Sequence, residues 1–142
     1  MQKNLVKLDI DQVDRVWDAC APILQRAIDR SEGYYGIDDL YQIVKKGHQD
    51  LWVMFDEEIL LAGTTRLVHY PNKSVLEVPF VATKDNDSVD DFRSMMSQIE
   101  EWAKEQGAES TAFAARPGWK KLFPDFKLKH TLMTKDYEDG HG

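Results

Sequence analysis

The stretch VLEVPFVATKDNDSVDDFRSMMSQIEEWAKEQGAESTAFAA, residues 75–115, decides the fold. It indicates a strand from Val75 to Thr83, a polar turn from Lys84 to Asp87, a helix from Ser88 to Gln106 and a second strand from Glu109 to Ala115. A helix that follows a strand through a tight turn directs its unpaired N–H groups, and about half a positive charge, beyond the strand end. The order of elements is therefore typical of a place that binds a nucleotide or cofactor.

The turn between that strand and helix has a composition that disagrees with this order. Its sequence is Lys84-Asp85-Asn86-Asp87, without glycine and with two carboxylates, whereas a loop that cradles phosphate is rich in glycine. The element order favours a cofactor, and the chemistry of this one turn argues against it.

The helix after this turn is well specified. Its N-terminus resembles a capping box, because Asp91 stands three residues after Ser88. Apolar residues recur at helical spacing and predict one buried stripe. The stripe consists of Phe92, Met95, Met96, Ile99, Trp102 and Ala103. We interpret it as core rather than as a ligand-binding surface.

The residues before this stretch predict two helices and a hairpin. We expect a short strand at 5–10, a long helix capped by Asp11 that Pro22 kinks or divides, and a second helix from Asp38 that ends at Gly47. The runs 50–55 and 59–70 form a hairpin around an acidic turn.

The residues after it predict an elbow at Arg116–Trp119, a short basic turn and a last strand from Lys127 to Tyr137. The fold class is therefore α/β (α+β), with a single mixed, mostly antiparallel sheet flanked by helices. We expect one domain over residues 1–137 and a flexible tail at 138–142.

Composition limits the function. The chain has 142 residues and a net charge of −7, which disfavours nucleic acid and anionic membranes as partners. The single cysteine, Cys20, excludes an internal disulfide and falls on an apolar helix face, as an inert buried thiol does. No apolar run is long enough to span a membrane and no signal-peptide core is present, so we expect a cytoplasmic protein.

The element order, with the segments LLAGTTRLVHYP, IEEWAKEQGAES and ARPGWKKLFPDFKLKHTLMTKDY, resembles the GNAT family of N-acetyltransferases. The pairing of a helix-borne Trp-Ala with a later Arg-x-Gly-Trp is similar to short GNAT-like proteins of tailed bacteriophages, some of which are internal virion proteins. That resemblance implies a location in the host cytoplasm or the virion.

The resemblance implies that acetyl-CoA lies where the strands 75–83 and 109–115 splay apart. Pro79 lacks an N–H and belongs at a bulge, an edge or a splay, which agrees with such a gap. By the resemblance, the pantetheine arm would run along Phe80, Val81 and Ala82. The pyrophosphate would reach the turn that begins at Lys84, directly after this strand.

At that turn the resemblance implies contacts to the pyrophosphate from Lys84, Asn86 and Ser88. Asp85 and Asp87 weaken the site, because like charges ~4 Å apart repel by about 1 kcal/mol in water and by more in a partly buried cleft. A solvated, helix-capping acidic cluster is the alternative interpretation of these aspartates.

The catalytic residues implied by the resemblance are Glu77 as general base, with His69 and His130 as further candidates. Alternation places Glu77, Pro79 and Val81 on one face of the strand, with Phe80 on the other. A solvent-facing glutamate is the structural alternative. The positions where the family often has a proton-donating tyrosine look like Phe123 and Phe126, which cannot donate.

Two hypotheses of different class remain. The first is an acetyl-CoA-dependent acyltransferase acting on a small-molecule or protein amine. The second is a GNAT-shaped protein without catalysis that binds a protein partner. Its contact surface would be the basic cluster that includes Arg116, Trp119, Lys120 and Lys121. The four histidines lack metal-ligand spacing, so we expect no metal.

Overall fold

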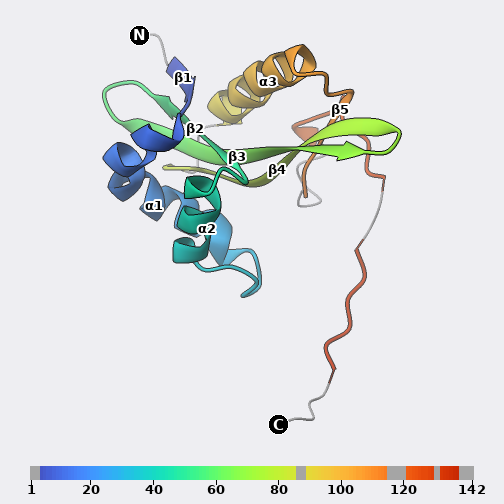
Figure 1. The fold of residues 1–142 in the computed structure, drawn as a ribbon, viewed down its shortest axis with the longest axis horizontal. Helices are drawn as coiled ribbons and strands as arrows, with labels where there is room; N and C mark the ends of the chain where they lie inside the picture. Colours follow the sequence, from blue (N-terminus) through green and yellow to red (C-terminus); the bar gives the residue numbers. More distant parts are fainter. Residues whose placement is uncertain (1–3, 86–88, 115–120, 130–131, 138–142) are drawn as a thin grey trace.

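The computed structural model describes residues 4–85, 89–114, 121–129 and 132–137. Five strands form one sheet in the order β1-β2-β3-β4-β5, which is also their order along the chain. The pairs β1–β2, β2–β3 and β3–β4 are antiparallel, and β4–β5 is parallel. Helices α1 and α2 cover one face and α3 covers the other (Figure 1). The predicted mixed, mostly antiparallel sheet flanked by helices is confirmed.

The central hairpin has the predicted bounds. Strand β2 spans Asp50–Phe55 and β3 spans Ile59–Tyr70, with Trp52 opposite Gly63. The first strand, β1 (Asn4–Lys7), is shorter than the predicted 5–10, because a 3-10 turn, η1 (Ile10–Gln12), follows it. Strand β4 (Lys73–Thr83) starts two residues earlier than predicted, since its first residue pairs with Tyr70 across the hairpin turn.

Helix α1 (Val13–Asp29) differs from its prediction in two ways. The N-cap of α1 is Gln12, the last residue of η1, so Asp11 is not the cap. Pro22 does not divide the helix, which is continuous over 17 residues. Proline removes the hydrogen bond to the carbonyl of Asp18, and both residues lie on the exposed side, where water can satisfy that carbonyl.

Helices α2 (Ile37–Lys45) and α3 (Val89–Glu105) follow their predictions closely. Gly47 has a φ of +80° after α2, which is the left-handed cap predicted there. On α3 the residues Met95, Met96, Ile99 and Ala103 are buried, and Phe92 and Trp102 pack against them. Ser88, the predicted cap of α3, lies outside the described residues.

The end of the chain departs most from prediction. Strand β5 (Ser110–Ala112) has three residues rather than the predicted seven from Glu109 to Ala115. The last predicted strand, Lys127 to Tyr137, is not a strand in either of its described parts, 127–129 and 132–137. A strand needs a neighbour to satisfy its backbone, and no described strand lies beside this segment. The tail 138–142 and the Arg116–Trp119 elbow lie outside the described residues.

Two apolar clusters hold the layers together. The first joins α1 and α2 to the sheet through Leu51, Val53, Ala62, Phe80 and Ala82. The second joins α3 to the other face through Trp52, Met54, Leu61, Leu76, Val78 and Val81. Cys20 lies fully buried in the first cluster, and burial raises the pKa of its thiol to about 12. The predicted burial of the Cys20 thiol is confirmed.

Gly63 brings α3 close to the sheet. A Cβ at this position would lie 2.9 Å from Met95 Cε, 3.1 Å from the Phe80 carbonyl oxygen and 3.2 Å from Val81 Cγ2. The methionine can move, but the β4 backbone cannot move without disturbing its ladder with β3.

We therefore predict that Gly63→Ala lowers the free energy of unfolding by about 1–3 kcal/mol through overpacking. Urea denaturation of both proteins measures the difference. A variant as stable as the wild type would show that β3 and β4 have room to separate here.

Candidate active site

The candidate site is built on a bulge in β4. Thr64 pairs with Phe80 and Arg66 pairs with Glu77, so Val78 and Pro79 together stand opposite the single residue Thr65. Pro79 has no N–H to offer to a ladder, which explains why the extra residue is accommodated here. The prediction that Pro79 belongs at a bulge is confirmed.

The parallel ladder between β4 and β5 ends beside this bulge. It pairs Val75 with Ser110, Leu76 with Thr111 and Glu77 with Ala112, and extends no further. Strand β4 continues for six residues beyond Glu77, to Thr83, still paired with β3 on its other side. All three residues of β5 are therefore paired, but only with Val75–Glu77 of β4, and no described strand lies beside the rest of β4 on this side.

Backbone groups of β4 face this unpaired edge. The Lys84 N–H donates to the Leu60 carbonyl at 2.7 Å, so Lys84 faces β3. Backbone groups alternate in direction along a strand, which directs those of Val81 and Thr83 away from β3. Within the described part of the chain, no strand pairs with them on that side.

The bulge changes which side chains share a face. Val78 and Val81 both pack in the α3 cluster, and Phe80 and Ala82 pack in the α1 and α2 cluster. Simple alternation predicted Val81 with Glu77 and Phe80 opposite, and this is wrong, because the extra residue inverts the alternation after Pro79. Glu77, between Leu76 and Val78, therefore shares its face with Phe80.

Glu77 accepts hydrogen bonds from two side chains of β3. Arg66 Nε donates to Glu77 Oε1 at 2.7 Å, and the Tyr70 hydroxyl donates to Oε2 at 3.2 Å. The Glu77 side chain is 24% exposed, against 47% for that of Arg66. Glu77 is thus a half-buried carboxylate held in place by a cation and a phenol, rather than a freely solvated one.

The two candidate histidines do not join Glu77 among the described residues. His69 follows the alternation of Leu67, which packs on the α3 side, so it lies on the opposite face of the sheet from Glu77. Its Nδ1 is 2.7 Å from the Ser74 hydroxyl. His130 lies outside the described residues.

Aromatic residues adjoin the site on the Glu77 face. Tyr35, in the connection between α1 and α2, makes an edge-to-face contact with Phe80, with 5.2 Å between ring centroids. Tyr35 is exposed, whereas Phe80 is buried, so the pair forms the border between core and solvent on this face.

Lys84, in the turn after β4, already has an ion-pair partner. The Lys84 ammonium forms an ion pair with Glu58 from the β2–β3 turn. Arg26 of α1 donates to the carbonyl oxygens of Thr83 at 2.7 Å and Lys84 at 2.9 Å. Asp85 is exposed beside them, and Asn86, Asp87 and Ser88 lie outside the described residues.

Sequence reasoning missed Arg66, Arg26 and Glu58. Arg66 is the only charged residue in the β3 run, which is a signal, but its partner depends on a register that the bulge shifts. Arg26 and Glu58 come from elements distant in sequence from Lys84, and no local pattern links them. Of the basic cluster, Lys121 is exposed, and Arg116, Trp119 and Lys120 lie outside the described residues.

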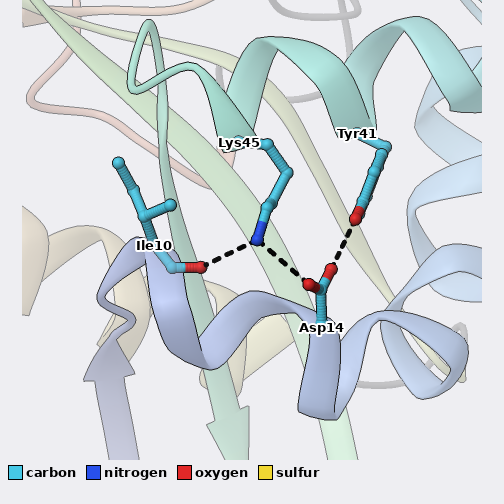
Figure 2. Close-up of polar contacts among 4 residues, drawn as sticks. All are labelled: Ile10, Asp14, Tyr41 and Lys45. Carbon is cyan, nitrogen blue, oxygen red and sulfur yellow. Dashed lines mark hydrogen bonds and ion pairs between the residues drawn. The ribbon is translucent and has the colours of Figure 1, made fainter.

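A second polar cluster joins η1 and α1 to α2 (Figure 2). Asp14 accepts from the Tyr41 hydroxyl at 2.5 Å and from the Lys45 ammonium at 3.0 Å, and Lys45 also reaches the Ile10 carbonyl at 3.5 Å. The Tyr41 hydrogen bond, followed by that of Lys45, lowers the pKa of the Asp14 carboxyl. The cluster fixes α2 against the start of α1, and with it the end of the connection that contains Tyr35.

We predict that Asp14→Asn lowers the melting temperature at neutral pH. A carboxyl with a lowered pKa contributes stability above its ordinary value of 3.8, and loses that contribution as the pH falls through its value in the folded protein. The difference between the two proteins should therefore shrink below pH 3.8. Thermal unfolding across pH measures it, and a difference independent of pH would assign the effect to something other than this carboxylate.

The residues that the structure describes contain no group of three or more histidine, cysteine, aspartate or glutamate side chains placed to hold a metal ion. None of the described helices has the length and apolar character needed to cross a bilayer.

Comparison with solved structures identifies the architecture. An aminoglycoside acetyltransferase from an uncultured soil metagenomic sample, in complex with trehalose, matches with a TM-score of 0.71 and 11% identity over 96% of this chain and 97% of that one. The ribosomal-protein-alanine N-acetyltransferase of Brucella melitensis biovar Abortus 2308 matches with a TM-score of 0.70 and 10% identity over 98% and 100%. This chain has the GNAT acetyltransferase fold. At these identities the likeness concerns the fold alone.

Sequence comparisons add no closer relative. No protein-family model matches the chain, and no curated protein matches it. The GNAT fold of this chain therefore rests on its three-dimensional arrangement, and its chemistry has to be argued from its own residues.

Proposed function

We propose that this protein is an acetyl-CoA-dependent N-acetyltransferase that acts on an amine. The observation that carries the proposal is the end of the β4–β5 ladder at Glu77, which leaves the backbone of Val81 and Thr83 facing an edge without a described strand. The Thr83 carbonyl already accepts from Arg26, but the other backbone groups of Val81 and Thr83 on this edge suit an extended amide chain such as pantetheine. Phe80, Val81 and Ala82 are its proposed contacts.

The acetyl thioester is the chemistry that acetyl-CoA supplies when bound. Glu77 is the proposed base, because an amine arrives as an ammonium ion and has to lose a proton before its nitrogen can attack the carbonyl carbon. Arg66 and Tyr70 fix the two oxygens of Glu77, so the carboxylate is oriented before the acceptor binds. His69 and His130 remain secondary proposals for proton transfer, with no described contact to Glu77.

Lys84, Asn86 and Ser88 are the proposed pyrophosphate contacts. The ion pair of Lys84 with Glu58 opposes this role, because an anion at the turn has to compete with a carboxylate already there. Arg26 adds a second cation at the end of β4, next to the same turn. Together these charges predict a site with low affinity for the cofactor, rather than no site at all.

Acetyl-CoA should stabilise the folded protein. A ligand present at 100 times its dissociation constant raises the free energy of unfolding by about 2.7 kcal/mol. Thermal unfolding with and without millimolar acetyl-CoA measures this, with free pantetheine and free acetate as controls for the arm and the acetyl group. The absence of any shift at the highest soluble concentration would contradict the proposal.

Removing the competing carboxylate should strengthen binding. We predict that Glu58→Gln frees Lys84 and increases the affinity for acetyl-CoA about two- to tenfold, since exposed ion pairs contribute up to about 1 kcal/mol. Isothermal titration measures the affinity. Glu57→Gln, at the neighbouring exposed position of the same turn, is the matched control. If both variants gain the same affinity for acetyl-CoA, the cause is the change in net charge and not the release of Lys84.

Replacing the proposed base should abolish turnover while keeping the fold. We expect Glu77→Gln to reduce the acetylation rate about 10²–10⁴-fold, the usual contribution of a positioned base. Thiol release from acetyl-CoA with a panel of amines gives the rate. Glu105→Gln, an exposed position on α3, is the control. Unchanged turnover in Glu77→Gln would remove this residue from the role.

The ion pair of Lys84 with Glu58 and the exposed Asp85 favour a second candidate function, that of a non-catalytic GNAT-shaped protein that binds a partner. The resemblance to short bacteriophage proteins suggests a structural role in the virion or binding to a host target, in the host cytoplasm. Arg116, Trp119, Lys120 and Lys121 are its proposed contact surface. If neither the wild type nor Glu58→Gln responds to acetyl-CoA, this candidate replaces the first.

A further inference from the structure

The turn end of the β3–β4 hairpin presents a face that no described helix covers. Its paired residues, which we call the hairpin face, are Arg66 and Glu77, Val68 and Val75, and Tyr70 and Lys73. Directly opposed residues of antiparallel strands share a face, and the Tyr70 hydroxyl reaches Glu77 at 3.2 Å, so all of them lie on the Glu77 side of the sheet. Helices α1 and α2 lie against the part of this side around Phe80, and the hairpin turn extends beyond them (Figure 1).

The ion pair of Arg66 and Glu77 gives the hairpin face two opposite charges side by side. Arg66 Nε donates to Glu77 Oε1 at 2.7 Å. The guanidinium has further N–H donors besides Nε, and the Arg66 side chain is 47% exposed, so these donors can reach a ligand. Each oxygen of a carboxylate can accept more than one hydrogen bond, so Glu77 Oε2 can accept from a ligand as well as from Tyr70.

A ligand with an ammonium and a carboxylate a few bonds apart matches this pair of charges. Its ammonium would contact Glu77 and its carboxylate would contact Arg66, so that every charge has an opposite neighbour. Arginine suits this contact because the planar guanidinium donates parallel hydrogen bonds to a carboxylate. An amine without a carboxylate also meets Arg66, but as a repelling charge that nothing offsets. The ion pair therefore favours a zwitterion over a plain cation.

Val68 and Val75 add an apolar surface next to the charges. The two valines pair directly and are half-buried, and neither belongs to or packs against the two apolar clusters of the described chain. Tyr70, which is 51% exposed, borders them at the turn end of the hairpin. Contact with an aliphatic side chain would remove apolar surface of these residues from water, which is favourable. The hairpin face therefore suits a zwitterion with an apolar side chain.

We propose that the hairpin face binds an α-amino acid with an apolar side chain as the acceptor of the acetyl group, and that Arg66 determines this specificity by binding the carboxylate. The inference rests on the proposed function, because it assigns the acceptor of the same site. The acceptor nitrogen forms a bond to the thioester carbonyl carbon, and the bond from that carbon to sulfur breaks with its electron pair going to sulfur. Of the protons that the ammonium loses, one goes to Glu77 and the other converts the thiolate to the thiol.

Binding of the acceptor tests the assignment apart from catalysis. Leucine and isopentylamine, which is leucine without its carboxylate, are titrated into the full chain with and without coenzyme A, and backbone amide chemical shifts are followed. We expect leucine to bind at least about tenfold more tightly, the effect of a charge-assisted hydrogen bond. The largest shifts should lie in residues 66–70 and 73–77. Leucylglycine is titrated as well, to separate a free amino acid from a peptide N-terminus.

Variants of Arg66 test its role in the preference. Arg66→Gln should give leucine and isopentylamine about equal affinities, and Arg66→Lys should keep part of the difference. The ratio of the two affinities is the measured quantity, because any effect of Arg66 on the orientation of Glu77 acts on both ligands. Lys104→Gln removes the same charge from an exposed position of α3, on the other side of the sheet, and as the matched control it should leave the ratio unchanged.

The outcomes separate this inference from the proposed function. Equal binding of leucine and isopentylamine to the wild type, no binding of either, a preference that persists in Arg66→Gln, or tighter binding of leucylglycine would each overturn the inference. Acetylation of isopentylamine with the same KM as leucine would overturn it while supporting the acetyltransferase. Leucine binding that depends on Arg66, without acetylation of any amine, would support the binding site and contradict the enzymatic function.

Discussion

The bulge at Val78 and Pro79 controls the geometry of everything on the far half of β4. It adds one residue to the strand opposite Thr65, so the side chains after it exchange faces relative to those before it. Phe80 and Ala82 thereby enter the α1 and α2 core, and Val81 enters the α3 core. The same extra residue brings Glu77 and Phe80 to one face, which a regular strand would not do.

The bulge also lies directly after the part of β4 that pairs with β5. Parallel pairing ends at Glu77, two residues before the proline, and among the described strands only β3 pairs with the rest of β4. In a sheet whose other strands pair side by side, this leaves one stretch of backbone with hydrogen-bonding capacity next to a carboxylate. The proposed acyl-transfer site rests on this arrangement, with the edge as the proposed place for an extended carrier and Glu77 as the proposed base.

Electrostatics limits how strongly such a site can hold an anionic carrier. Lys84 already has a carboxylate partner, and Glu77 already has a guanidinium partner. Both pairs are at least partly exposed, so each contributes little stability and can be exchanged for a ligand at modest cost. The proposed cofactor site should therefore bind phosphate weakly.

Local sequence patterns determined the elements that depend on local physics. Helical spacing predicts the buried stripe of α3, and Gly47 predicts the end of α2. The acidic turn between two strand-like runs predicts the β2–β3 hairpin. Pro79 alone predicts an irregularity in β4, because the missing N–H is a property of that one residue. The tertiary structure alone decided which residues meet. The partners of Glu77 and Lys84 come from other elements, and the register set by the bulge could not be read from alternation. It also decided that residues 127–129 and 132–137 are not a strand, because a strand exists only where a second backbone satisfies it and no described strand pairs with them.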